Sequence, residues 1–243
     1  EAVFQFESRG MQGMLRDARP TRLEDLIALN ALYRPGPMDL IPSFVARKHG
    51  REPVEYPHPL VAEMLSETYG IMVYQEQVMQ TAQILGGYSL GGADLLRRAM
   101  GKKKPEEMAQ HRLIFREGAA KNGIAEGKAD EIFDLMEKFA GYGFNKSHAA
   151  AYSLLAYHTA WLKVHYTAEF FCANMTVEMD NTDKLKVLYE DALKEGMTFD
   201  PPDVNRGGYR FEPVSDTLIR YGLGAIKGTG QQAIEAIVAA REG

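Results

Sequence analysis

The chain has 243 residues, of which 45% are hydrophobic and 25% are charged. This balance is typical of a globular protein and excludes a disordered chain, a collagen and a disulfide-rich miniprotein. The formal net charge of −5 excludes a polycation, so any contact with nucleic acid depends on a local basic patch.

The single cysteine, Cys172, excludes an internal disulfide and suits a reducing compartment such as the cytoplasm. No stretch of about 18 apolar residues occurs, so no membrane span is expected. The first residues lack an initiator methionine and lack the basic start and apolar core of a signal peptide. We therefore interpret the chain as a piece of a longer protein.

Most of the sequence predicts helices. Thr21-x-x-Glu24 has the pattern of a capping box, and the helix that it opens ends at Leu32, before the prolines of residues 34–37. Residues 50–59 predict an extended loop, and residues 71–74 predict a short strand or the approach to a helix. Further helices are expected over 75–85, 92–100, 105–121, 128–139, 147–165, 167–175 and 182–196.

The composition changes at Pro201-Pro202, which we take as a boundary. Beyond it, residues 209–212 and 217–221 alternate as in a two-stranded hairpin. Residues 222–230 are rich in glycine, and a final helix is expected over 231–241. The predicted fold is mainly α, with a helical domain over 1–200 and a small α+β unit over 201–243.

Basic side chains concentrate in residues 97–121, which hold eight basic residues against three acidic ones. Such a patch attracts phosphates through Coulomb energy and counterion release. Within it, Arg97 and Arg98 offer planar guanidinium groups suited to phosphate oxygens. Lys102, Lys103 and Lys104 are equally compatible with a solvated loop that has no ligand.

A second cluster lies in residues 141–148, at the predicted start of the long apolar helix. A helix N-terminus attracts anions because its first amides lack partners, and Lys146, Ser147 and His148 add donors there. Tyr142 offers a stacking face for a base or sugar, or alternatively a core anchor.

Other patterns predict packing only. Tyr152, Tyr157, Trp161 and Tyr166 have the spacing of a helical core, and Cys172 is expected to be buried and unreactive. Residues 222–230 only superficially resemble a dinucleotide loop, which would have to follow a buried parallel strand. No P-loop, no nucleophile elbow and no paired Asp-x-Asp carboxylates occur, so neither a catalytic residue nor a metal site is predicted.

Five segments in order resemble the alpha subunit of bacterial DNA polymerase III, the C-family of replicative polymerases. They are residues 3–11, 31–37, 70–77, 95–104 and 139–149. The resemblance implies the fingers region of a DNA-directed DNA polymerase, a nucleotidyltransferase of the bacterial cytoplasm. It also implies that the palm carboxylates, which hold magnesium in this family, lie outside this chain, so that the chain alone is inactive.

The resemblance assigns binding roles as well. Arg97 and Arg98 would contact the triphosphate of the incoming deoxynucleotide, Tyr142 its sugar or base, and His148 its phosphates, with Lys146 in support. Lys102, Lys103 and Lys104 would contact template-primer DNA. The segment with Lys227, Gly228 and Gly230 resembles the hairpin of a helix-hairpin-helix element, which binds DNA phosphate.

The implied partners are therefore a deoxynucleoside triphosphate, template-primer DNA, the remainder of the polymerase subunit and the replicase holoenzyme, with no membrane. The alternative hypothesis from a different class is a helical interaction scaffold whose basic patch contacts an acidic protein and which has no nucleotide role.

Overall fold

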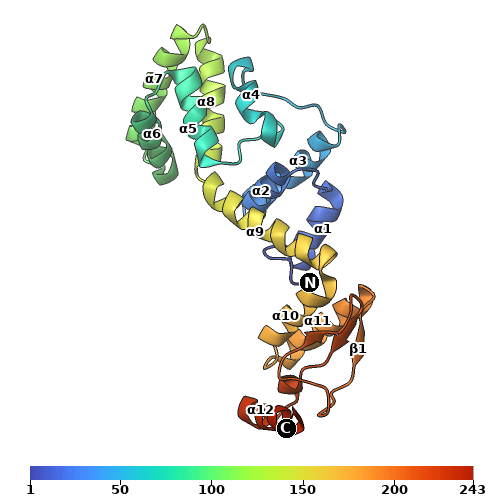
Figure 1. The fold of residues 1–243 in the computed structure, drawn as a ribbon. Helices are drawn as coiled ribbons and strands as arrows, with labels where there is room; N and C mark the ends of the chain where they lie inside the picture. The colour runs from blue at the N-terminus through green and yellow to red at the C-terminus, as the bar shows by residue number, and fades with distance from the viewer. Residues whose placement is uncertain (243) are drawn as a thin grey trace. The chain divides into compact units, whose positions relative to one another are not determined.

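A computed structural model describes residues 1–242, which form two compact units (Figure 1). One unit comprises Ser8–Leu154, and the other combines Glu1–Glu7 with the chain from Leu155 onward. The division falls inside helix α9 (Lys146–His165), which contributes residues to both units. The sequence-based boundary near residue 200 instead marks a change in composition.

The unit Ser8–Leu154 is helical. Its α-helices are α1 (Arg9–Ala18), α2 (Leu23–Leu32), α3 (Ile41–Lys48), α4 (Ala62–Leu65), α5 (Gln75–Gly86), α6 (Leu90–Lys102), α7 (Pro105–Lys121), α8 (Glu126–Ala140) and the first part of α9. Short 3-10 turns η1 (Pro37–Leu40), η2 (Pro59–Val61) and η3 (Ser66–Thr68) lie between them. Helices α1 and α3 were not predicted, whereas α5 to α8 lie where the sequence places them.

Helices α5, α6, α7 and α8 pack side by side around the main core of this unit (Figure 1). Leu85, Leu96, Phe115 and Phe133 are fully buried there. Helices α5 and α7 approach so closely that a Cβ atom added at Gly118 would lie 1.7 Å from the carbonyl oxygen of Gly86. This contact therefore requires glycine on α7.

Several predicted helix boundaries are confirmed. Pro105 is the first residue of α7, and α5 ends at Gly86, with Gly87 as its C-cap at a φ of 69°, in the left-handed region. The capping box at Thr21 is wrong, because Arg22 is the N-cap and makes no capping hydrogen bond. Instead the amide of Thr21 donates to the carboxylate of Asp25, 3.1 Å away, so the acid one residue after Glu24 takes this role.

In the unit that includes residues 155–242, α10 (Thr167–Val177) and α11 (Thr182–Lys194) pack against a small sheet. Its strands are β1 (Thr198–Asp200), β2 (Glu212–Pro213) and β3 (Leu218–Arg220), in the order β1-β3-β2. The antiparallel β2–β3 pair confirms the predicted hairpin, and the parallel strand β1 was missed. The 3-10 turn η4 (Leu223–Ala225) and helix α12 (Gln231–Glu242) follow, and the mainly α fold is confirmed.

The expected aromatic core of α9 is wrong. Tyr152, Tyr157, Trp161 and Tyr166 are between 37% and 51% exposed. The buried positions of α9 are small instead: Ala149, Ser153 and Ala156 are each at most 1% exposed, at the spacing of one helix face. Small side chains let neighbouring elements approach this face closely, so the large side chains of α9 lie on its other faces.

The contact between α5 and α7 predicts that the effect of a glycine-to-alanine substitution on stability depends strongly on its position. We expect Gly118→Ala to lower the free energy of unfolding by about 3 kcal/mol, because its methyl group would overlap a backbone atom rather than a mobile side chain. Gly13 on α1 has no atom within 4 Å of its added Cβ, so Gly13→Ala should raise stability by about 0.5–1 kcal/mol. Urea denaturation of both variants checks this, and equal effects would contradict it.

A buried carboxylate joins α2, α3 and the turn after η3. Asp25 is fully buried, and its oxygens accept hydrogen bonds from the Thr21 amide and, at 3.1 Å, from the Tyr69 hydroxyl. The Lys48 ammonium lies 3.3 Å away. Burial alone would raise the pKa of Asp25, but the Thr21 amide, the Lys48 charge and the Tyr69 hydroxyl together lower it below its ordinary value.

This lowered pKa predicts the direction of a pH effect. The carboxylate stabilises the fold fully above its unfolded pKa, which is about 3.9, and this stabilisation is lost as the pH falls through the lower folded pKa. We expect Asp25→Asn to cost about 3 kcal/mol at neutral pH, because it leaves Lys48 without its buried partner. The cost should shrink in acid, as followed by urea denaturation. Asp39→Asn, at an exposed position, should have no such pH-dependent cost.

Candidate functional site

The turn of residues 142–148 is held by backbone pairing with the segment that leads into α5. The Phe144 amide donates to the Val73 carbonyl at 3.2 Å, and the Phe144 carbonyl accepts from the Gln75 amide at 3.0 Å. Of the two alternatives predicted for residues 71–74, a short strand or the approach to a helix, the structure has the second, since these residues make only an isolated parallel bridge between Tyr74 and Phe144 and lead into α5 at Gln75. A Cβ atom at Gly143 would lie only 3.1 Å from the Gln75 backbone, so the pairing leaves little room for a side chain there.

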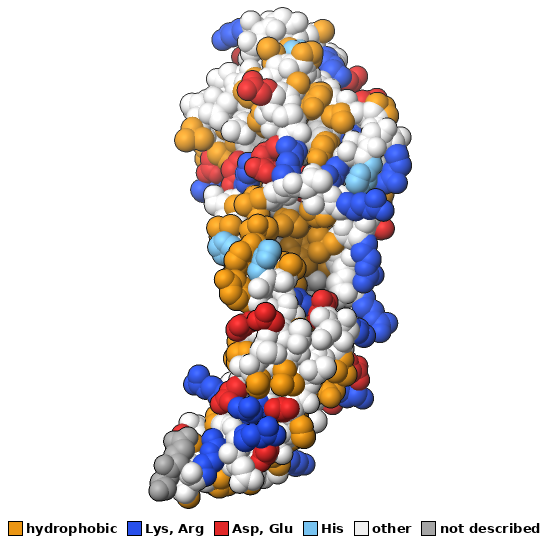
Figure 2. All heavy atoms as spheres, turned by 45° about the vertical axis from the view of Figure 1, so that its right-hand side comes forward, with side chains coloured by type: hydrophobic (Ala, Val, Ile, Leu, Met, Phe, Trp, Pro, Cys, Tyr) orange, Lys and Arg blue, Asp and Glu red, His pale blue; other side chains and the backbone are white. Residues whose placement is uncertain are grey.

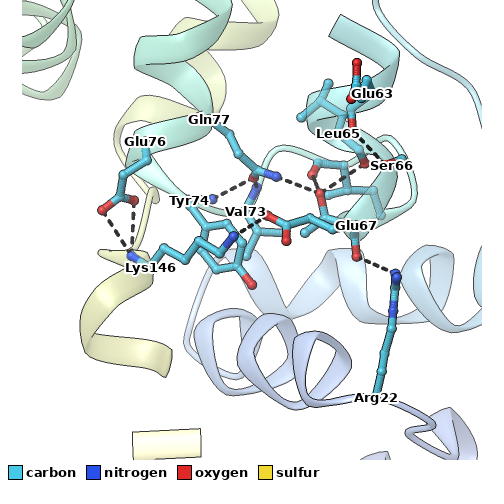
Figure 3. A network of polar contacts seen from close by, with 12 residues as sticks. Arg22, Glu63, Leu65, Ser66, Glu67, Val73, Tyr74, Glu76, Gln77 and Lys146 are labelled. Atoms are coloured by element: carbon cyan, nitrogen blue, oxygen red, sulfur yellow. Dashed lines mark hydrogen bonds and ion pairs between the residues drawn. The ribbon is translucent and has the colours of Figure 1, made fainter. Parts of the chain in front are cut away.

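The start of α9 already has an internal anion. Both oxygens of Glu76 accept from the Lys146 amide, at 3.1 and 3.2 Å (Figure 3). Glu76 Oε1 also accepts from the Asn145 side chain at 2.8 Å. Asn145 Oδ1 in turn accepts from the His148 amide at 2.8 Å. The amides of Lys146 and His148 therefore already have acceptors within the protein, while the predicted nucleotide contacts of the Lys146 and His148 side chains stay predictions.

The side chain of Lys146 is also engaged. Its Nζ lies 2.6 Å from Glu67 Oε1 and 5.5 Å from the centre of the Tyr74 ring (Figure 3). Tyr74 is 1% exposed, and burial, with the nearby Glu67 carboxylate, raises the pKa of its phenol. Lys146 thus anchors the start of α9 to η3.

A buried amide fixes the segment on which this turn rests. Gln77 Oε1 accepts from the amides of Val73 and Tyr74, at 2.8 and 3.0 Å, and its Nε2 donates to the Thr68 hydroxyl at 2.9 Å (Figure 3). The Thr68 hydroxyl donates to the Ile71 carbonyl at 2.6 Å. Since every polar atom of the Gln77 side chain is bonded, residues 71–74 have a defined backbone without belonging to a strand.

Tyr142 and His148 present aromatic surface next to this framework. Tyr142 is 45% exposed, and its ring packs on Gly36, where a Cβ atom would lie 2.6 Å from a ring carbon. The Arg34 guanidinium donates to the Tyr142 carbonyl and lies 4.7 Å from the centre of the Phe144 ring. The exposed His148 ring stacks on Tyr152 with centroids 4.3 Å apart. This surface has the geometry to stack on a base or sugar.

Arg97 and Arg98 share one carboxylate on α6. An Nη2 atom of each lies close to Asp94, at 2.8 Å for Arg97 and 2.9 Å for Arg98. The hydrogen bond from Arg97, with the positive charges of both arginines, lowers the pKa of Asp94. The Arg98 side chain is 62% exposed and that of Arg97 26%, so the two guanidinium groups are held together while one remains open to solvent.

The basic segment as a whole is less positive than its sequence indicates. Arg112 pairs with Asp134 of α8, and Arg116 pairs with Asp130 at 2.7 Å. Lys104 pairs with Glu107 at 2.9 Å. Lys102 and Lys103 are exposed at the end of α6 and make no ion pair within residues 1–242. The acids of α8, outside the counted segment, thus neutralise much of its charge.

The predicted C-terminal binding residues form an exposed turn before α12. Lys227, Gly228 and Gly230 are all exposed, and Gly228 has a φ of 89°. The Thr229 hydroxyl lies 2.7 Å from the Ile226 carbonyl and 2.9 Å from that of Leu223, which closes the turn. The parallel β1–β3 pair before it is three residues long and has only β2 and loops between its strands, so a dinucleotide-binding unit is not formed.

The structure brings Tyr142, Lys146 and His148 into one turn and holds Arg97 and Arg98 side by side on α6. No hydrogen bond or ion pair among the described residues links the two groups. Their convergence on one ligand therefore stays a prediction.

Residues 1–242 contain neither a cluster of metal ligands nor a membrane-spanning helix. No three His, Cys, Asp or Glu side chains gather there in a way that would hold a metal ion. None of the described helices combines the length and apolar character needed to cross a bilayer. Figure 2 shows apolar side chains gathered on part of the face that it draws. Trp161 and Val164 of α9 are exposed apolar residues. Cys172 is buried as expected, and burial raises the pKa of its thiol to about 12.

The model of the bacterial DNA polymerase III alpha subunit finger domain matches residues 1–123, and that of a helix-hairpin-helix motif matches residues 196–243. DNA polymerase III subunit alpha of Neisseria meningitidis serogroup B is 67% identical over 241 residues, which cover 99% of this chain and 21% of that protein. The counterpart from Xylella fastidiosa (strain Temecula1) is 65% identical over 240 residues, covering 99% and 20%. That from Escherichia coli (strain K12) is 57% identical over 247 residues, covering 99% and 21%.

These matches place the chain in the class of polymerase finger domains. The chain belongs to the family of bacterial DNA polymerase III alpha subunit finger domains, as its sequence motifs indicated. It spans about a fifth of the length of the curated relatives that it matches.

Three carboxylates that organise these groups were missed by sequence reasoning. Asp94 was detectable, because it lies three and four residues before Arg97 and Arg98, the spacing of helical ion pairs. Glu67 and Glu76 lie 79 and 70 residues before Lys146, so nothing local in the sequence connects them with the start of α9.

The cap on α9 yields a stability prediction. We expect Glu76→Ala to lower the free energy of unfolding by about 1 kcal/mol, since the Lys146 amide loses its partner and the helix end its negative charge. Glu76→Gln keeps one acceptor oxygen and should lose less. Urea denaturation measures both. Glu117→Ala, at an exposed position of α7, is the matched control and should be nearly neutral. A larger loss in the control than in Glu76→Ala would refute the capping role.

Proposed function

We propose that this chain acts in DNA replication as the fingers of a DNA-directed DNA polymerase, where it binds the incoming deoxynucleoside triphosphate and template-primer DNA. The observation that carries the proposal is 67% identity to a DNA polymerase III subunit alpha across 99% of the chain. The remainder of such a subunit and the replicase holoenzyme are the partners that this role requires.

Arg97 and Arg98 are the proposed triphosphate contacts. The Asp94 carboxylate now joins the two arginines. Phosphate oxygens are also negatively charged acceptors, and guanidinium groups bind them through the same kind of charge-assisted hydrogen bond. A triphosphate that approaches the exposed Arg98 would compete with Asp94 for both groups. Donors fixed before the reaction stabilise the charge that develops on phosphate oxygens during transfer, without a reorganisation cost.

The turn of residues 142–148 is the proposed contact for the nucleoside. Tyr142, 45% exposed and packed on Gly36, would lie against the sugar or base. His148 would face the phosphates. Lys146 would support this role indirectly. Its ammonium lies 2.6 Å from the Glu67 carboxylate, and this ion pair keeps the turn in place.

Template-primer DNA is the proposed ligand of two exposed segments. Lys102 and Lys103, which carry no ion pair in the described chain, and Lys104 after them would contact the DNA backbone. The turn with Lys227, Gly228 and Gly230 falls within the helix-hairpin-helix match and would contact a DNA phosphate.

The family implies magnesium, and the described residues do not fit it, since they place no three suitable ligands together. Our proposal is that carboxylates elsewhere in the polymerase hold magnesium and that the isolated chain does not extend a primer.

Primer extension by a complete polymerase subunit that carries this chain tests the nucleotide role. We expect Arg98→Ala to lower kcat/KM for the incoming nucleotide on the order of 10²-fold, the effect of removing one preplaced donor. The loss should be larger for the Arg97→Ala, Arg98→Ala double variant, whereas Arg98→Lys should retain part of the activity.

Lys121→Ala is the control for a general change of charge, because Lys121 is exposed at the far end of the same basic segment. It should leave kcat/KM unchanged. If Arg98→Ala also leaves kcat/KM unchanged, the proposed triphosphate contact is wrong.

A further inference from the structure

A basic cavity lies away from the residues assigned above, between α1 and the end of α3. Its volume is about 730 Å³, within the usual range for ligand sites. Three arginines line it: Arg16 and Arg19 at the end of α1, and Arg51 in the turn after α3. His49 also lines it, and Asp17 contributes the single acidic side chain of its wall.

These three arginines differ from most others in the unit Ser8–Leu154 because no carboxylate pairs with them in the described structure. Arg16 donates only to the neutral Gln12 side chain, at 3.5 Å. The Asp17 carbonyl, rather than its carboxylate, accepts from His49 Nε2 at 3.1 Å. Ion pairs are made by the arginines at 22, 47, 97, 98, 112 and 116.

Helix dipoles account for only part of this charge, because of the three arginines Arg16 lies in the last turn of α1, where a cation complements the dipole. Cations at a helix C-terminus complement the dipole, but the last turn of α3 already has Arg47 and Lys48, which pair with Glu52 and Asp25. Arg51 lies beyond that turn. Arg19 is the C-cap of α1 with a φ of 45°, a conformation that favours glycine or asparagine. Arg19 therefore occupies this position beside the cavity in a backbone conformation that is unfavourable for an arginine.

The rest of the wall is apolar and well anchored. Met14 and Val45 are at most 7% exposed and belong to the packed faces of α1 and α3. Pro42, which is exposed, continues this apolar part of the lining. The cavity therefore combines a fixed apolar floor with guanidinium groups that come from two separate elements.

We propose that this cavity binds the phosphodiester backbone of a single nucleic-acid strand, at a site separate from the proposed nucleotide site. Guanidinium groups pair with phosphate oxygens, and charges spread over α1 and the turn after α3 match several phosphates in a row rather than one. The apolar floor suits the sugar and base faces of the same strand. This inference does not depend on the roles of Arg97, Arg98 or the turn of residues 142–148.

Arginine footprinting tests the site within a complete polymerase subunit that carries this chain. Phenylglyoxal modification of each arginine is measured by peptide mass spectrometry, with a short single-stranded oligodeoxythymidine, with a deoxynucleoside triphosphate, or with neither. We expect the oligonucleotide to slow modification of Arg16, Arg19 and Arg51 several-fold. Arg9, exposed on α1 but outside the cavity lining, should be unaffected and is the matched control.

The results with the oligonucleotide and with the triphosphate distinguish failure of this inference from failure of the proposed function. Protection of Arg98 by the triphosphate, without protection of the three cavity arginines by the oligonucleotide, would overturn the inference and leave the proposed function standing. Protection of the cavity by the oligonucleotide, with Arg98 unprotected in both arms, would support the inference and count against the proposed function. Protection of the cavity by the triphosphate alone would also overturn binding of a strand.

Charge reversal gives a second, quantitative test. We expect the double variant Arg19→Glu, Arg51→Glu to bind the oligonucleotide on the order of tenfold more weakly in fluorescence anisotropy. The slope of log affinity against log salt should fall by about 0.7 for each phosphate contact removed. Arg9→Glu should change neither quantity as much, and circular dichroism verifies that the variants fold. An unchanged salt slope in a folded double variant would refute the site.

Discussion

The short backbone pairing between Tyr74 and Phe144 is the constraint on which the candidate nucleotide surface depends. It consists of two hydrogen bonds, yet it joins segments 70 residues apart in the sequence. On one side of it, Gln77 fixes the extended segment, and on the other, Glu76 caps α9. The orientation of the exposed turn is therefore set by the start of α5 and by α9 together, and a polymerase ligand would meet a surface that is already ordered.

Most of the helical architecture was predictable because its signals are local. Pro105 and Gly87 mark helix ends through their own backbone preferences, and the Asn181 side chain caps α11 by accepting from the Lys184 amide. The aromatic side chains of α9 were misplaced because spacing identifies a helix face without indicating which face is buried. Packing selected the face of Ala149, Ser153 and Ala156, where small size rather than hydrophobicity decides the approach of neighbouring elements.

The candidate site was predictable in its residue types and less so in its electrostatics. Family motifs pointed to Arg97, Arg98 and the turn of residues 142–148, but the charge of a segment cannot be added up without its spatial neighbours. The acids of α8 neutralise Arg112 and Arg116, whereas the cavity beside α1 has three arginines that pair with no carboxylate of residues 1–242. Neither outcome follows from local spacing, because each depends on which helices pack together.

The burial of Cys172 has a practical consequence for spectroscopy. It is the single cysteine of the chain, it is 4% exposed, and its thiol stays protonated at neutral pH because its pKa is raised to about 12. Maleimide and iodoacetamide reagents attack thiolates, so the native residue offers them almost no target. A cysteine placed at an exposed position would then accept a fluorophore or spin label selectively, without any need to replace the natural one.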